Sequence, residues 1–223
     1  PMVAKFLISL IKFALYFLIA IIVISVLGIP TTSLIAALSA AGLTLGLALQ
    51  GSLSNFAGGV LILLFKPFKI GDFVKEDVHG NEGLVEGIDL FYTRMRTFDN
   101  KIVIIPNGSL ANTSITNYTA NNKRRIEIKV GISYDSDMKR AKDILMNVIN
   151  SQDGILKNED NKVYVDALEE SQITIGTMAW VMTDDYWKIK WDLTEKFKNA
   201  LDDAGIEIPF NQLSVTINEK QRK

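Results

Sequence analysis

The sequence predicts a membrane protein with two unlike halves, an α-helical membrane domain followed by all-β and α+β domains outside the bilayer. The chain has 24 basic and 25 acidic residues among 223, yet residues 13–65 contain none of them. A water-exposed domain does not need 53 consecutive uncharged residues, because its helices and loops present a polar face to solvent. After residue 66 the pattern changes to short alternating strands and charged amphipathic helices. These two observations exclude a protein that is dissolved wholly in water.

The membrane domain is expected in residues 1–66, as a hairpin of two transmembrane helices. Val3–Gly28 is the first helix, and Gly28-Ile29-Pro30 ends it, because proline lacks a backbone N–H and glycine adopts turn dihedrals. The second helix is expected over residues 31–66. Both ends of the hairpin carry lysines, and basic residues favour the cytoplasmic side of a membrane. We therefore expect a multi-pass protein of the cytoplasmic (inner) membrane with its charged domain in the cytoplasm; the lysines are Lys5, Lys12, Lys66 and Lys69.

The second helix is rich in small residues rather than in large lipid-facing ones. At 100° per residue, Leu47 lies 40° from Leu43 and shares its face. Small residues occupy both flanks of this face: Gly42 and Gly46 on one, and Ala40, Thr44 and Ala48 on the other. Small residues let helix backbones approach closely, so the two flanks favour a closed ring of helices with leucines facing the axis. A helix-dimer contact is the alternative interpretation of the Gly-x-x-x-Gly spacing.

Further along this helix, glycines indicate places where it could bend. Gly51 stands among Gln50, Ser52 and Ser54, and Gly59 belongs to a glycine pair. Glycine costs about 1 kcal/mol relative to alanine inside a helix, so kinks are expected at such places. Gly51 and Gly59 are the predicted hinges. The alternative is that these glycines serve only close packing.

The charged half is expected to contain two domains and a final strand. Residues 67–125 are predicted to form a compact, Sm/OB-like β-domain, and residues 126–212 a ferredoxin-like α/β domain with the order β-α-β-β-α-β. Residues 213–223 are predicted to contain a last strand, Leu213–Ile217, and a tail. The strands expected in the β-domain are Phe73–Lys75, Gly83–Ile88, Thr93–Thr97 and Lys101–Ile105. Those expected in the α/β domain are Ile126–Ile132, Val163–Leu168 and Ile173–Met182, with helices from Ser136 and over Trp187–Ala204.

The composition points away from an enzyme. The chain has no cysteine and one histidine, His79, so thiol chemistry and a histidine-rich metal site are excluded. No pattern of nucleophile, base or phosphate-binding glycine loop occurs, and we expect no catalytic residue, metal or cofactor. A net charge of −1 lacks the basic footprint of a nucleic-acid-binding protein.

Four motifs resemble those of the small-conductance mechanosensitive channels, the MscS-like family. The resemblance covers nearly all of residues 30–218, and the joint occurrence of the motifs is highly specific. It implies a homoheptamer whose seven helices line one conduit, a hollow cytoplasmic cage with side portals, and an intersubunit β-barrel built from each chain's last strand. The motifs are AAGLTLGLALQGSLSN at 40–55, FKPFKIGD at 65–72, IIPNG at 104–108 and YDSD at 134–137.

The resemblance also assigns roles to individual residues. Leu43 and Leu47 match the hydrophobic pore gate, Gly42 and Gly46 match the glycines of pore-helix packing, and Gly51 matches the kink. Ala36 and Ala40 match the small partners of the glycines. Ser39 and Thr44 depart from the glycine and alanine usual at their positions. The family has a further helix before the one at Val3, so we expect a truncated membrane domain or a chain without that helix.

The function expected is that of a mechanosensitive channel, opened by membrane tension, which releases ions and small osmolytes on hypo-osmotic shock. Its expected partners are membrane lipids, copies of the same chain, and the permeating ions and small solutes, with no nucleic acid. The alternative is a membrane-anchored oligomeric binding or scaffold protein. The two differ at Leu43 and Leu47, because only a channel gate is sensitive to polar substitution there.

Overall fold

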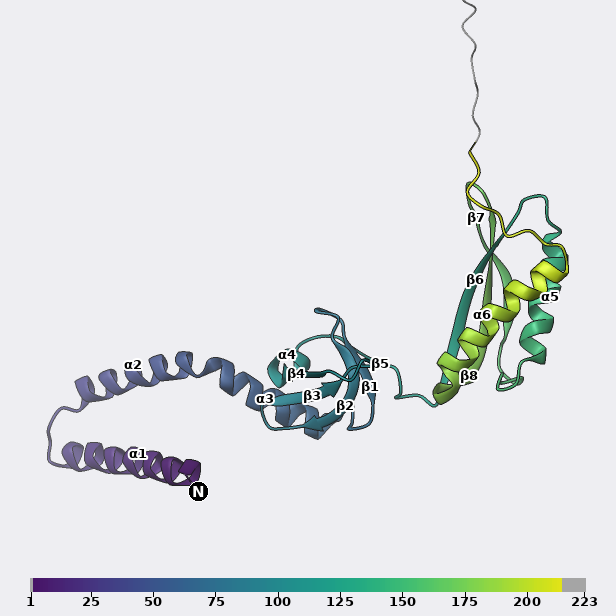
Figure 1. Cartoon of the computed structure of the whole chain (residues 1–223). Helices are drawn as coiled ribbons and strands as arrows, with labels where there is room; N and C mark the ends of the chain where they lie inside the picture. The colour runs from purple at the N-terminus through teal and green to yellow at the C-terminus, as the bar shows by residue number, and fades with distance from the viewer. Residues whose placement is uncertain (1, 214–223) are drawn as a thin grey trace, which may run out of the picture. The chain divides into compact units, whose positions relative to one another are not determined.

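The computed structural model describes residues 2–213 (Figure 1). The chain divides into two compact units. One contains Pro1–Gly71 and Glu76–Ile115, and the other contains Asp72–Lys75 and Thr116–Lys223. Two segments that fall within the predicted β-domain, Asp72–Lys75 and residues 116–125, belong to the second unit.

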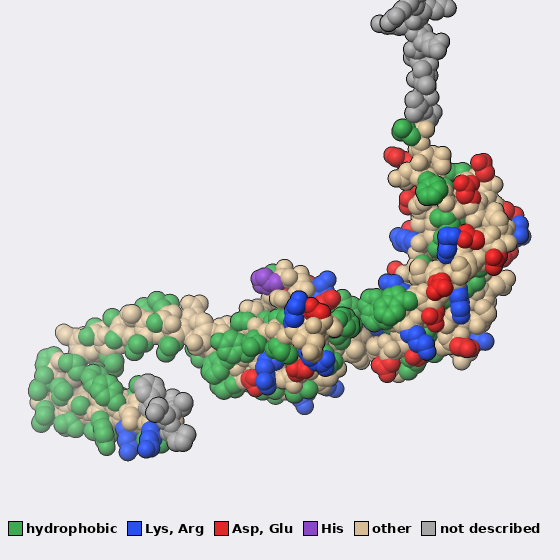
Figure 2. Space-filling view, in the orientation of Figure 1, with side chains coloured by type: hydrophobic (Ala, Val, Ile, Leu, Met, Phe, Trp, Pro, Cys, Tyr) green, Lys and Arg blue, Asp and Glu red, His purple; other side chains and the backbone are tan. Residues whose placement is uncertain are grey.

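The first helix, α1, runs over Met2–Val26 and agrees with the helix predicted from Val3. Its stretch Ile8–Val26 has a mean hydropathy of 2.5 and is long and apolar enough to cross a membrane. Gly28, with φ of +79°, turns the chain after it. Figure 2 shows apolar side chains over α1, with basic ones only toward its N-terminal end.

The predicted second helix is divided into two, α2 at Thr32–Ala48 and α3 at Gln50–Phe65. The pair is long and apolar enough to be one broken span, and its two axes differ in direction by 63°. α3 ends at Lys66, which adopts a left-handed conformation with φ of 50°. Pro67 follows and cannot continue the helix.

The β-domain has five strands in the order β4-β3-β2-β1-β5. Four of them match the predicted strands to within one residue at each end, whereas β5, which has three residues, was missed. Alternate residues point inward, and Val85, Met95 and Ile105 contribute to the core with Ile62 and Phe68. The elements are β1 Phe73–Glu76, β2 Glu82–Ile88, β3 Tyr92–Arg96, β4 Ile102–Pro106, helix α4 Asn107–Ala111 and β5 Ile115–Asn117.

The α/β domain has an antiparallel sheet of order β6-β8-β7, with α5 and α6 on one face of it (Figure 1). The predicted order of elements is confirmed as far as α6. Of the predicted last strand, Leu213–Ile217, all but Leu213 lies outside the described residues. The elements are β6 Lys123–Ile132, α5 Met138–Ser151, β7 Lys162–Leu168, β8 Ile173–Met182, the 3₁₀ turn η1 Thr183–Asp185 and α6 Tyr186–Asp203.

The core of this domain lies between the sheet and the two helices. α5 contributes Ala141, Leu145 and Ile149, which follow the helical spacing of three and four. α6 contributes a second apolar stripe and is followed by Gly205, with φ of +69°. The α6 stripe consists of Tyr186, Ile189, Leu193, Phe197 and Leu201.

A cation–π stack connects the start of β6 to the start of α6. The guanidinium carbon of Arg124 lies 3.6 Å from the ring centroid of Tyr186 and 5.1 Å from that of Tyr118. The ring of Tyr118 in turn lies 6.0 Å from that of Phe73. Arg124 therefore packs between two aromatic rings, whereas Arg125 pairs with Glu127 at the surface and lies farther from an aromatic ring, 5.9 Å from the centroid of Trp180.

Candidate pore-lining segment

The leucine face of α2 is open to the surroundings in this chain. Leu43 is 66% exposed and Leu47 is 63% exposed. They are four residues apart in an unbroken helix, so their side chains lie one above the other on one face, as predicted from the helical period. No ionisable residue lies on α2.

The flanks of the leucine face are equally open. Ala36 and Ala40 are exposed, and a Cβ added at Gly42 or Gly46 would meet no heavy atom within 4 Å in the described part of the chain. The Thr44 hydroxyl donates to the backbone oxygen of Ala40 at 2.9 Å, so its polarity is satisfied inside its own helix. The threonine therefore leaves no unpaired hydroxyl on this flank of α2.

The bend lies at Leu49, between α2 and α3, rather than at a glycine. Leu49 has φ of −97° and ψ of 0°, and its N–H still donates to the oxygen of Leu45 at 3.0 Å. Gly51 lies two residues later, inside α3, and a Cβ added there would meet no heavy atom within 4 Å in the described part of the chain. The region of the predicted hinge is thus bent, but the break itself precedes Gly51.

Gly59, the other predicted hinge, lies in a straight part of α3 that packs on the β-domain. α3 continues without a break through Gly58 and Gly59 to Phe65, and both glycines are buried against the β-domain. A Cβ on Gly58 would lie 2.5 Å from the backbone oxygen of Asn107, and one on Gly59 would lie 2.2 Å from the backbone oxygen of Leu90. The pair is therefore a close-packing contact between backbones, which was the alternative interpretation.

Hydrogen bonds around Asn107 fix this contact. Asn107 is fully buried. Its Nδ2 donates to the backbone oxygen of Asp89 at 2.8 Å, and its Oδ1 accepts from the Thr93 hydroxyl at 2.7 Å. The next residue, Gly108, donates its N–H to Oδ1 of Asn55 on α3 at 3.0 Å. The sequence motif containing Asn107 was recognised, but its link to α3 was not predicted.

A second buried polar group supports the turn after β1. Glu76 is 2% exposed, and its carboxylate accepts backbone N–H bonds from Val78 and His79 at 2.8 and 3.0 Å. Burial acts to raise the pKa of Glu76, but these hydrogen bonds and the neighbouring His79 outweigh it and hold the pKa below its ordinary value of 4.5. Glu76 is thus a structural anion that stabilises the turn.

The arrangement contains no group of three or more metal-ligating side chains within the described residues. An apolar helix long enough to cross a membrane, a bent second helix with an uncharged leucine face, and charged β and α/β domains after it define a class of protein, a membrane protein with a large charged portion beyond its helices.

Comparisons with known proteins narrow this class. Three family models match consecutive parts of the chain: mechanosensitive ion channel transmembrane helices 2/3 at residues 9–50, the mechanosensitive ion channel β-domain at 51–120, and the MscS C-terminal domain at 126–208. The chain belongs to the MscS family of mechanosensitive ion channels. The membership predicted from the motifs is confirmed, and the family is one of channels rather than enzymes.

Individual relatives agree with this assignment. An uncharacterised MscS family protein of Buchnera aphidicola subsp. Baizongia pistaciae is 41% identical over 218 residues, which are 98% of this chain and 77% of that protein. A small-conductance mechanosensitive channel of Edwardsiella ictaluri is 43% identical over 79% of this chain and 61% of that protein. The crystal structure of Helicobacter pylori MscS in a closed state superimposes with a TM-score of 0.83 at 35% identity, over 94% of this chain and 83% of that one.

Proposed function

We propose that copies of this chain form a homo-oligomeric channel in the cytoplasmic membrane, opened by membrane tension to release ions and small osmolytes. Its relatives carry the name of small-conductance mechanosensitive channels. Lysines at both ends of the helical hairpin support a cytoplasmic position for the charged domains. The family resemblance supports seven copies.

The observation that carries this proposal is the open face of α2. Leu43 and Leu47 are exposed together, and the small residues of both flanks are exposed beside them. A ring of such helices buries Ala36, Ala40, Gly42 and Gly46 between neighbours and turns the leucines toward the axis. Two stacked rings of leucine side chains form a narrow apolar constriction, which blocks ions by dewetting.

The bend at Leu49 supports different roles for the two helices: α2 moves, and α3 stays fixed to the β-domain. α3 is held to the β-domain through Gly58, Gly59 and the Asn55–Gly108 hydrogen bond, whereas α2 has no buried residue within the described chain. Tension favours the state with the larger membrane area, and it therefore shifts an existing equilibrium between the closed and open states. In this mechanism α2 tilts away from the axis about the bend at Leu49, while α3 stays on its domain.

The finer architecture follows the same family pattern. The sheet order β6-β8-β7 with both helices on one face supports a ferredoxin-like α/β domain. The small five-stranded domain supports the Sm/OB-like assignment, and Leu213–Ile217 is the proposed strand of an intersubunit β-barrel. These domains enclose the cytoplasmic cage through which permeating solutes pass.

Patch recording tests the proposal directly. The chain is reconstituted in liposomes, and currents are recorded under a suction ramp, beside a version extended at its N-terminus. Discrete openings whose frequency rises with tension are expected. Silence of both versions, while they remain folded and oligomeric, would contradict the proposal and favour a membrane-anchored scaffold.

A further inference from the structure

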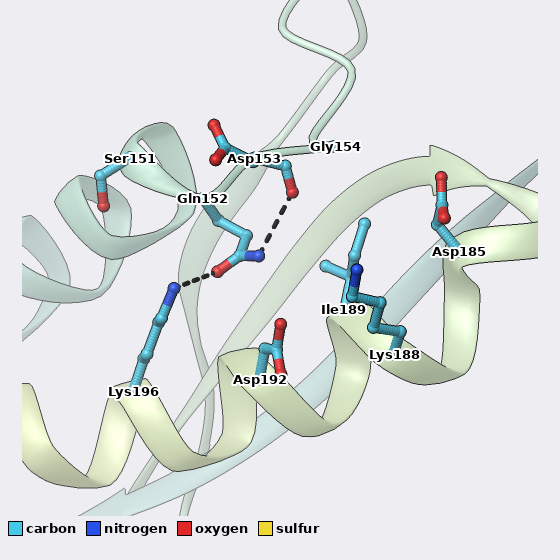
Figure 3. A pocket seen from close by; sticks show the side chains of 9 residues that line it. All are labelled: Ser151, Gln152, Asp153, Gly154, Asp185, Lys188, Ile189, Asp192 and Lys196. Carbon is cyan, nitrogen blue, oxygen red and sulfur yellow. Dashed lines mark hydrogen bonds between the residues drawn. The ribbon is translucent and has the colours of Figure 1, made fainter.

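A cavity of about 410 Å³ lies in the α/β domain between the loop after α5 and the first turns of α6 (Figure 3). The loop contributes Gln152 and Asp153, the turn before α6 contributes Asp185, and α6 contributes Lys188, Asp192 and Lys196. Charges of both signs therefore line one cavity, and no part of the channel mechanism above uses them.

The charges on α6 are spaced to pair with one another but do not. Lys188 and Asp192 are four residues apart, as are Asp192 and Lys196, the spacing at which helix ion pairs form. Neither pair comes within 4.0 Å in the part of the chain that the structure describes. The next pair of the same kind on this helix, Lys198 and Asp202, does form an ion pair.

Gln152 explains why Lys196 does not pair with Asp192. The Gln152 side chain is only 6% exposed, and its Oε1 accepts a hydrogen bond from Nζ of Lys196 at 2.8 Å. Its Nε2 donates to the backbone oxygen of Asp153 at 3.2 Å, which fixes the amide in this orientation. Lys196 is thus held toward the loop, and the Asp192 carboxylate is left without a partner among the described residues.

The loop and the helix approach each other closely at the back of the cavity. Gly154 has φ of +87°, and a Cβ there would lie 2.6 Å from Cδ1 of the buried Ile189. The positive φ favours glycine at this position. Gly154 and the buried Ile189 therefore form a packed part of the lining, whereas Asp153, Lys188 and Lys196 are exposed around it.

We propose that this cavity binds a small zwitterion of the amino-acid class. Its ammonium group would donate to the carboxylate of Asp192, and its carboxylate would accept from the ammonium group of Lys188. Charge-assisted hydrogen bonds of this kind are about twice as strong as neutral ones. A ligand with one charge would satisfy one half of this lining and leave the other unpaired.

Tryptophan fluorescence offers a local readout of binding. All three tryptophans of the chain, Trp180, Trp187 and Trp191, lie in the α/β domain, and two of them are on α6. The full chain in detergent is titrated with glycine, β-alanine and γ-aminobutyrate, and with butylammonium and butyrate as singly charged controls. The shift in unfolding temperature with each compound is a second readout, because a ligand that binds the folded state stabilises it.

At least one zwitterion is expected to give a saturable signal that neither singly charged compound gives. Asp192→Asn and Lys188→Met are each expected to weaken its binding about tenfold, the loss of one charge-assisted bond. Glu195→Gln, a matched change on the same helix outside the cavity, is expected to leave it unchanged. Each variant must elute as the parent oligomer does.

Three outcomes would overturn the proposal. They are the absence of a saturable signal with every zwitterion by both readouts, equal binding of butylammonium, and unchanged binding in both cavity variants. Because no current is measured, these results leave the proposed channel function untouched.

Discussion

Replacing Gly59 by alanine should loosen α3 from the β-domain. The added Cβ would lie 2.2 Å from the Leu90 oxygen and 2.7 Å from Nδ2 of Asn107, and the first of these atoms is backbone that cannot rotate away. Carbon and heavy-atom neighbours prefer about 3.5 Å, so the helix has to move outward by about 1 Å. Overpacking of this kind costs about 1–3 kcal/mol, and the higher helix propensity of alanine offsets about 1 kcal/mol of it.

Hydrogen exchange at the Gly108 amide measures this loosening, because that amide donates to Asn55 on α3. A net loss of about 1.4 kcal/mol in the free energy of local opening corresponds to about tenfold faster exchange. Gly51→Ala is the matched control on the same helix, since its Cβ would meet no atom within 4 Å in the described chain. Exchange that is unchanged or slower in Gly59→Ala would refute the close contact of the two backbones.

Three further changes test other parts of the structure. Asn55→Ala removes the acceptor of the Gly108 amide and should lower the free energy of unfolding by about 1 kcal/mol, measured by chemical denaturation; no change would contradict that bond. Glu76 has a lowered pKa, so its stabilising effect is complete above its ordinary value of 4.5 and is lost as pH falls through the lower folded value. Unfolding midpoints measured from neutral to acidic pH should fall more steeply for the parent than for Glu76→Gln, and parallel curves would contradict this. Arg124→Met should cost about 1 kcal/mol through the lost cation–π stack, whereas Arg125→Met should cost less; equal losses in denaturation curves would argue against the stack.

The elements with a clear period were predictable from sequence. The apolar residues of α6 recur at helical spacing in the sequence, and they lie inward in the structure. β5 was missed because the three residues of Ile115–Asn117 are too short to show an alternation. β6 begins at Lys123, before the predicted Ile126, because its first residues are charged yet pair in register with the end of β8.

The features of the candidate site that depend on the period of a single helix were predictable from the sequence. Those that depend on contacts between residues distant in the chain were not. The shared face of Leu43 and Leu47 follows from the helical period alone. Gly59 was assigned to a hinge because a sequence does not show that Leu90 and Asn107, distant in the chain, approach its backbone. The bend falls at Leu49, two residues before the glycine that local propensity indicates.

Leu43 and Leu47 are proposed to form the constriction of a tension-gated pore. The most direct test is the opening threshold of Leu47→Ser in liposome patches under a suction ramp. Leu45→Ser is the matched control, because Leu45 lies on the opposite side of α2 and is equally exposed, at 63%. A lower threshold for Leu47→Ser alone is predicted, since a hydroxyl favours wetting of the constriction. A threshold equal to that of the parent chain would contradict the claim.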